Sequence, residues 1–144
     1  MRISTIQWAA GMALVLGAAG AVATSASRVA ASERPVSYAA DQAARGEAKY
    51  LSECEECHGD DLKGGLNGGA SLAGNAFNEK WGEGMQASAL FAYLANEMPP
   101  DNAGRYSPKA YAEIMAYILM RNGYPEGAEL PSDIDALDAL IMQR

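Results

Sequence analysis

Residues 54–58 read Cys54-Glu55-Glu56-Cys57-His58, and this pentapeptide contains both cysteines and the only histidine of the 144-residue chain. On a helix, side chains three and four residues apart lie on one face, so both thiols and the imidazole can face a single planar group. C-x-x-C-H is the spacing at which c-type haem is attached. The motif therefore predicts one covalent haem c, bound through Cys54 and Cys57, with His58 as an axial ligand of the iron.

Other chemistries fit these residues less well. A thioredoxin-like redox pair follows a strand within a βαβ unit, and no strand-forming run precedes Cys54. A structural disulfide between the two cysteines explains neither His58 nor the glycine after it. Structural zinc needs four ligands, whereas this run offers three and the chain has no second cluster of Cys and His. Haem attachment is the interpretation that uses all three side chains.

The N-terminus has the features of an export signal. A short positive start precedes an apolar run at 8–23, and small residues with A-x-A-like cleavage sites follow, after Ala23 or Ala31. We interpret residues 1–31 as a signal peptide and expect a periplasmic protein. The apolar run approaches the ~20 residues of a bilayer span, so an uncleaved membrane anchor is the alternative. Contact with a membrane is expected only in that case.

Charge narrows the range of partners. Of the 11 basic residues, Arg2 and Arg28 lie in the predicted signal, which leaves nine basic against 18 acidic residues and a net charge of −9. Nucleic acid is therefore not expected as a partner, because its recognition needs a basic surface. The acidic balance favours either docking to a basic partner surface or solubility alone.

The chain beyond the signal is long enough for one domain. We expect a flexible lead-in at 32–40, an all-α domain with the cytochrome c fold at 41–130, and a C-terminal tail at 131–144 that holds at most a short helix. Apolar periodicity and capping residues predict three main helices and short ones, with no strand. They lie at 41–51 and on into the haem motif (cap Asp41), at 76–81, at 88–97 (cap Ser88), at 108–121 (cap Ser107) and after Ser132.

Glycines mark two special places. Gly46 in mid-helix costs ~1 kcal/mol relative to alanine, which indicates the close approach of another helix. The glycine-rich stretch at 59–76 lacks the G-K-[ST] of a phosphate-binding loop. Its small residues and turn formers suit a loop that wraps the edge of a haem.

The sequence resembles the class I c-type cytochromes over residues 43–130. Gly46 and Tyr50 look like the glycine and the aromatic residue of that family's first helix. Ile114 and Tyr117 look like the residues of its last helix that cross over them. The resemblance implies a fold of helices and loops around a covalent haem, with these two helices in tight contact.

The same resemblance suggests the walls of the haem pocket. Leu72, Phe77 and Trp81 look like pocket residues of one subgroup. That family usually has Gly-Pro-x-Leu after the histidine, the proline carbonyl binding the imidazole, and here the run is Gly-Ala-Ser-Leu. Because a carbonyl is a backbone group, Ala70 can still accept this bond from His58.

The second axial ligand must be a methionine or be absent, since there is no second histidine. The candidates outside the signal are Met85, Met98, Met115, Met120 and Met142. We favour Met98, because it leaves a predicted helix directly before two prolines that hold the chain away from helical geometry. Met115 and Met120 are expected in the core and Met142 in the tail. Met85 and an open sixth site remain alternatives.

The resemblance implies an electron-transfer protein and not an enzyme. We expect a one-electron carrier that works between a periplasmic dehydrogenase or respiratory donor and an oxidase or other acceptor. One alternative is a fixed electron-transfer subunit of a dehydrogenase complex. Another is a sensor or peroxidase-like protein with an open sixth site, for which Arg105 and Tyr106 are the nearest polar groups after Met98.

Overall fold

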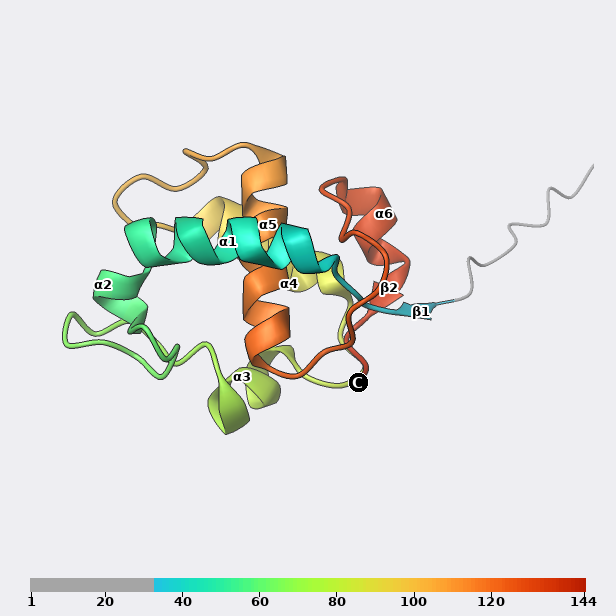
Figure 1. Cartoon of the computed structure of the whole chain (residues 1–144), viewed down its shortest axis with the longest axis horizontal. Helices are drawn as coiled ribbons and strands as arrows, with labels where there is room; N and C mark the ends of the chain where they lie inside the picture. Colours follow the sequence, from blue (N-terminus) through green and yellow to red (C-terminus); the bar gives the residue numbers. More distant parts are fainter. Residues whose placement is uncertain (1–32) are drawn as a thin grey trace, which may run out of the picture.

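The computed structural model describes residues 33–144, so the predicted signal at 1–31 lies outside the described residues. The elements are listed here in chain order (Figure 1): β1 (Arg34–Pro35), α1 (Ala40–Glu53), α2 (Glu55–His58), α3 (Gly74–Trp81), α4 (Ala87–Glu97), α5 (Pro108–Arg121), α6 (Ile134–Asp138) and β2 (Leu140–Ile141). The prediction of a helical fold with three main helices is confirmed. None of the helices in this part of the chain is both long and apolar enough to cross a membrane.

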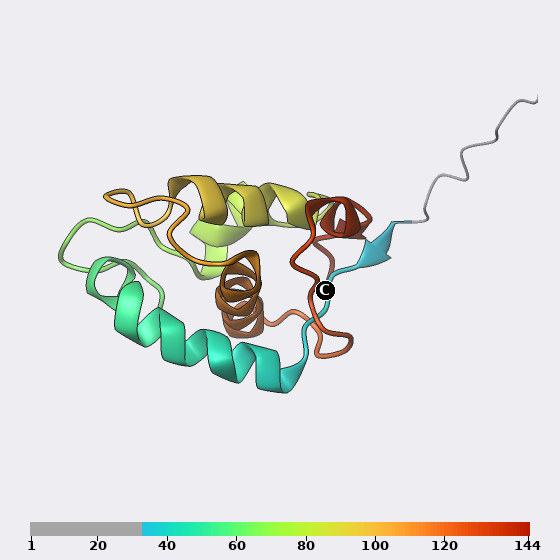
Figure 2. The ribbon, with the colours of Figure 1, turned by 90° about the horizontal axis from the view of Figure 1, so that it is seen from above.

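Helix α5 is the centre of the molecule. It crosses α1 steeply (Figure 1) and lies between α1 and α4 when viewed along its axis (Figure 2). Nine consecutive residues of α5, from Tyr111 to Leu119, are buried. A helix that is buried all round must be packed on every side. Helices α1 and α4 pack against two sides of α5. On the side of the haem motif, α5 lines the cavity described below.

The tight crossing of α1 and α5 is present as predicted. A Cβ atom added to Gly46 would lie 1.8 Å from the backbone oxygen of Glu113 and 3.1 Å from Cβ of Tyr117. One turn further on, the rings of Tyr50 and Tyr117 lie 5.2 Å apart between centroids. The residue nearest Gly46 is therefore Glu113, whereas Ile114 was expected there. Ile114 instead lines the cavity described below.

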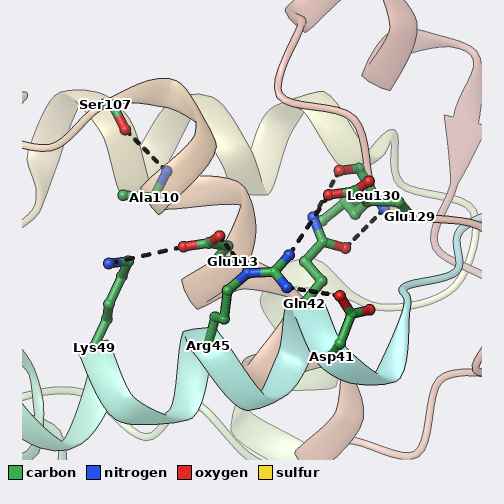
Figure 3. Close-up of polar contacts among 9 residues, drawn as sticks. All are labelled: Asp41, Gln42, Arg45, Lys49, Ser107, Ala110, Glu113, Glu129 and Leu130. Atoms are coloured by element: carbon green, nitrogen blue, oxygen red, sulfur yellow. Dashed lines mark hydrogen bonds and ion pairs between the residues drawn. The ribbon is translucent and has the colours of Figure 1, made fainter.

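A cluster of charges lies over this crossing (Figure 3). The Glu113 side chain is only 6% exposed, and its carboxylate accepts a 2.7 Å bond from Arg45 Nε and lies 3.8 Å from Lys49 Nζ. Arg45 also pairs with Asp41 at 2.7 Å and lies 3.7 Å from Glu129. A buried carboxylate is tolerated only when it is paired and hydrogen-bonded. These contacts place Glu113 in the helix crossing without an uncompensated charge.

The two ends of the described chain pair with each other, which corrects the expectations of a flexible lead-in and of a domain without strands. Strands β1 and β2 are parallel, with Arg34 opposite Leu140. The lead-in predicted to be flexible buries Val36 completely, and the predicted tail buries Leu137 and Met142 completely. Strands of two residues are too short for an alternating pattern to be read from sequence. Burial of apolar residues from both ends explains why the segments stay together.

Helix starts were predicted less well than helix positions. Ser107 caps α5 as expected, with its hydroxyl accepting a bond from the Ala110 backbone at 3.2 Å. Asp41, Ser88 and Ser132 are not the caps, because α1 and α4 begin earlier and Asp133 caps α6. The N-cap residues of α1 and α4 are Ala39 and Gln86, and neither side chain accepts a capping bond. Helix ends fray, so their bounds shift by one or two residues.

Gln42 joins α1 to the segment before α6. Its side chain is 1% exposed. The amide nitrogen donates to the carbonyl of Leu130, and the amide oxygen accepts from the backbone N–H of Leu130, both at 2.8 Å. Gln42 thus satisfies two buried backbone groups of a segment that has no helical or strand partner of its own.

We therefore expect Gln42→Leu to lower the free energy of unfolding by about 1–3 kcal/mol, the usual cost of leaving buried polar groups unpaired. Denaturant unfolding of the haem-loaded protein measures this change. Ser37→Ala is the control, since the Ser37 hydroxyl bonds the same region, at Ala128, from an exposed position. An unfolding midpoint unchanged by Gln42→Leu contradicts the prediction.

Candidate haem site

A cavity of about 430 Å³ opens beside the haem motif, between α1, α3, α4 and α5. A volume of roughly 300–1,000 Å³ is typical of cofactor sites. Seven of the eight residues predicted for the site line it: Cys54, Cys57, His58, Ala70, Leu72, Trp81 and Met98. Aliphatic side chains of α4 and α5 form much of the remaining wall, namely Leu90, Leu94, Ile114 and Ile118.

Phe77 is the exception. Its side chain is completely buried in the core, and it does not belong to the wall of the cavity. Trp81, one turn further along α3, does line the cavity, and its ring lies 5.1 Å from that of Tyr93. Positions four apart on a helix differ by about 40° in direction. This difference is enough for Trp81 to face the cavity while Phe77 packs into the core.

The cysteines sit at the junction of α1 and α2. Cys54 ends α1, and its carbonyl accepts the backbone N–H of His58 at 2.9 Å, which makes the motif a single tight turn. Cys54 is half-buried and Cys57 is exposed. Burial raises the pKa of the Cys54 thiol to about 11. Helix α1 leads directly into Cys54, whereas a thioredoxin-like pair follows a strand within a βαβ unit.

The imidazole of His58 is oriented by the glycine-rich loop at 59–76. Its Nδ1 lies 2.7 Å from the backbone oxygen of Ala70. With Nδ1–H donating to this carbonyl, Nε2 keeps its lone pair for a metal. Replacement of the usual proline by alanine thus leaves the acceptor in position, because the interaction involves only the backbone.

The loop itself is attached to the motif through backbone contacts. Cys57 O accepts the N–H groups of Gly65 at 2.8 Å and Gly69 at 3.1 Å. A Cβ on Gly69 would lie 2.2 Å from that same oxygen, so a glycine is required there. Asn122 holds the other end of the loop, since its side-chain nitrogen donates to the carbonyl of Leu72 at 2.8 Å. No pattern in the sequence indicates this role of Asn122.

Among the methionines of the described region, Met98 is the one that lines the cavity. It follows the last turn of α4, and its carbonyl accepts a 2.8 Å bond from the hydroxyl of Tyr111. Met85 is 38% exposed and lies outside the wall, while Met115 and Met142 are completely buried in the core. No pattern in the sequence indicates this bond from Tyr111.

The donor set and the cavity fit a haem. Two thiols and an imidazole with a free nitrogen reach the cavity from one short stretch of chain, and a thioether reaches it from the end of α4. The aliphatic and aromatic wall suits a large, flat, apolar group, with few polar side chains placed around it. These features, within crossed helices, define a c-type cytochrome domain.

A comparison with known protein families also indicates a c-type cytochrome domain. The family model described as cytochrome C oxidase, cbb3-type, subunit III matches residues 41–118. Because this match spans more than half of the 144 residues, the chain belongs to that family of c-type cytochrome domains. The family implies haem c as cofactor and electron transfer as the type of function. No curated protein matches the chain.

A solved structure is also similar. It is the sulfane dehydrogenase SoxCD from Paracoccus pantotrophus, with 26% sequence identity and a TM-score of 0.47. The match covers 79% of this chain and 61% of that chain, so the present chain spans less than two thirds of its length.

Proposed function

We propose that this protein is an exported one-electron carrier with a single haem c, attached through Cys54 and Cys57 and ligated by His58 and Met98. The observation that carries the proposal is the convergence of four side chains of suitable chemistry on one apolar cavity. When bound, the haem supplies one-electron redox chemistry at its iron.

Each residue has a distinct task. Cys54 and Cys57 hold the group covalently, and the Ala70 carbonyl keeps His58 in the tautomer that ligates through Nε2. With haem bound, the Met98 thioether would stabilise the reduced iron and so raise its reduction potential. Leu90, together with the other aliphatic side chains of the wall, keeps water from the iron.

In this proposal, electrons would enter and leave through the edge of the haem that lies next to Cys57. Cys57 is exposed, whereas Cys54 is partly buried at the end of α1. The surface around this edge is the natural contact for redox partners, and such encounters are weak and transient. The net negative charge favours partners with a basic docking surface.

A periplasmic dehydrogenase as donor and an oxidase as acceptor fit this role. The name of the family, an oxidase subunit, supports an oxidase on the acceptor side. A free carrier elutes as a monomer and exchanges electrons with several proteins, whereas a fixed subunit co-purifies with one. Purification from the periplasm distinguishes these two arrangements.

Ligation by Met98 is tested by Met98→Ala. The variant should lose the weak sulfur-to-iron band in the far red, and its reduction potential should fall by on the order of 100 mV, well within the roughly 0.8 V that axial ligands span. Met85→Ala is the matched control, because Met85 is exposed and outside the cavity. Loss of the band in Met85→Ala, or its persistence in Met98→Ala, contradicts the assignment.

A further inference from the structure

The loop from Met98 to Ser107 joins α4 to α5 and carries the proposed ligand at its first residue. Two of its backbone hydrogen bonds are local: the Met98 N–H donates to Leu94 O of α4 at 3.2 Å, and within the loop the Asn102 N–H donates to Pro99 O at 3.0 Å. Local turns alone leave a loop free to move as a unit. The position of Met98 over the cavity therefore depends on what holds the far end of the loop.

A polar cluster holds that end to α1. The hydroxyl of Tyr106 donates to Glu53 Oε2 at 2.6 Å, and Arg105 forms an ion pair with the same carboxylate. The guanidinium of Arg105 also lies over the ring of Tyr106, 4.6 Å from its centroid. The side chains of Glu53 and Arg105 are 35% and 32% exposed, so the cluster is partly shielded from solvent.

The cluster is continuous with Met98 through a second tyrosine. The rings of Tyr106 and Tyr111 meet edge to face, with centroids 5.4 Å apart. Tyr111 then donates to the carbonyl of Met98 at 2.8 Å. Glu53 directly precedes Cys54, so this chain of contacts connects the haem-attachment end of α1 to the proposed ligand. Of the residues in this chain of contacts, Arg105 alone is not part of the cavity wall.

We propose that Glu53, Arg105 and Tyr106 form a latch that fixes residues 98–107 over the cavity and so keeps Met98 in place. The inference rests on the proposed ligation by Met98. An isolated surface ion pair contributes little. Here the carboxylate also accepts a charge-assisted bond from a hydroxyl, and Tyr106 is in turn packed against Tyr111, so the contacts reinforce one another.

The test uses the haem-loaded full chain with Glu53→Gln and Tyr106→Phe. Both variants should increase the rate of imidazole binding to the oxidised iron on the order of tenfold, the effect of losing one charge-assisted bond. Backbone hydrogen exchange in residues 98–107 should accelerate to a similar extent. Arg105→Lys keeps the positive charge and should retain most of the protection, whereas Arg105→Ala should not.

Two controls match these changes. Glu47→Gln makes the same change of charge at an exposed position of α1, and Tyr38→Phe removes a hydroxyl from a buried tyrosine that lies outside the cavity wall. Neither should alter imidazole binding or loop exchange. If residues 98–107 exchange their backbone hydrogens no faster in Glu53→Gln and Tyr106→Phe than in the wild type, the latch proposal is wrong. Imidazole binding in Met98→Ala no faster than in the wild type overturns the ligation instead, and the exchange experiment then still decides the latch.

Discussion

Replacing Gly46 by valine should lower the free energy of unfolding of the haem-loaded protein by about 3 kcal/mol, the upper end of the usual cost of overpacking. The added Cβ atom would lie 1.8 Å from the carbonyl oxygen of Glu113. A backbone atom cannot rotate away as the end of a side chain can, so α1 and α5 must move apart. Denaturant titration followed by circular dichroism measures the loss.

Ala44→Val separates this effect from helix propensity. Ala44 is exposed on the same helix, so valine there incurs only the loss of propensity, about 0.7 kcal/mol or less. A Gly46→Val protein as stable as Ala44→Val contradicts the tight crossing. A reduced yield of haem-loaded Gly46→Val is expected as well, because the crossing supports the wall of the cavity.

Removal of both thiols, in Cys54→Ala/Cys57→Ala, should abolish covalent haem and leave a protein that is largely unfolded. Without haem, the apolar wall of the cavity of about 430 Å³ stays open to water, and the domain loses the burial that this wall would otherwise contribute. A small domain has a total stability of only about 5–15 kcal/mol, so a loss of this kind is a large fraction of it. The haem is thus expected to be part of the core.

Intact mass spectrometry of protein matured in the periplasm checks this prediction. The wild type should exceed the mass of its polypeptide by one haem, and acid–acetone should extract none of it. Glu55→Gln/Glu56→Gln, which alters only the residues between the cysteines, should keep the added mass. Haem extractable from the wild type contradicts attachment at Cys54 and Cys57.

The features predicted well from sequence have local signatures. The motif at 54–58 places its thiols and imidazole by helical spacing alone, and the glycine at 46 indicates a close approach because nothing else justifies its cost in a helix. The stripe of α5 and its Ser107 cap identify that helix for the same reason. These are interactions within one turn or within one element.

Contacts between distant segments were missed. Pairing of β1 with β2 joins Arg34 to Leu140, and no pattern within either two-residue strand indicates it. No pattern near Glu113 indicates that it is buried, because its burial depends on pairing with Arg45 of another helix. Phe77 was assigned to the cavity by resemblance to the pocket residues of a family subgroup, and a resemblance of sequence does not fix which way a side chain on α3 points.

The sequence by itself therefore determined the class of cofactor and the helical architecture, and it predicts Cys54 and Cys57 as the attachment residues, because each of these follows from the chemistry and spacing of residues close together in the chain. Only the tertiary structure decided which methionine lines the cavity, and how Glu53, Tyr106 and Tyr111 connect it to the haem motif. The Tyr106–Glu53 contact links residues 53 positions apart, and the Tyr111–Met98 contact joins α5 to the end of α4 across 13 positions. Such pairs have no mutual signal in a single sequence, since their proximity arises only when the packing of α1, α4 and α5 buries their apolar faces together.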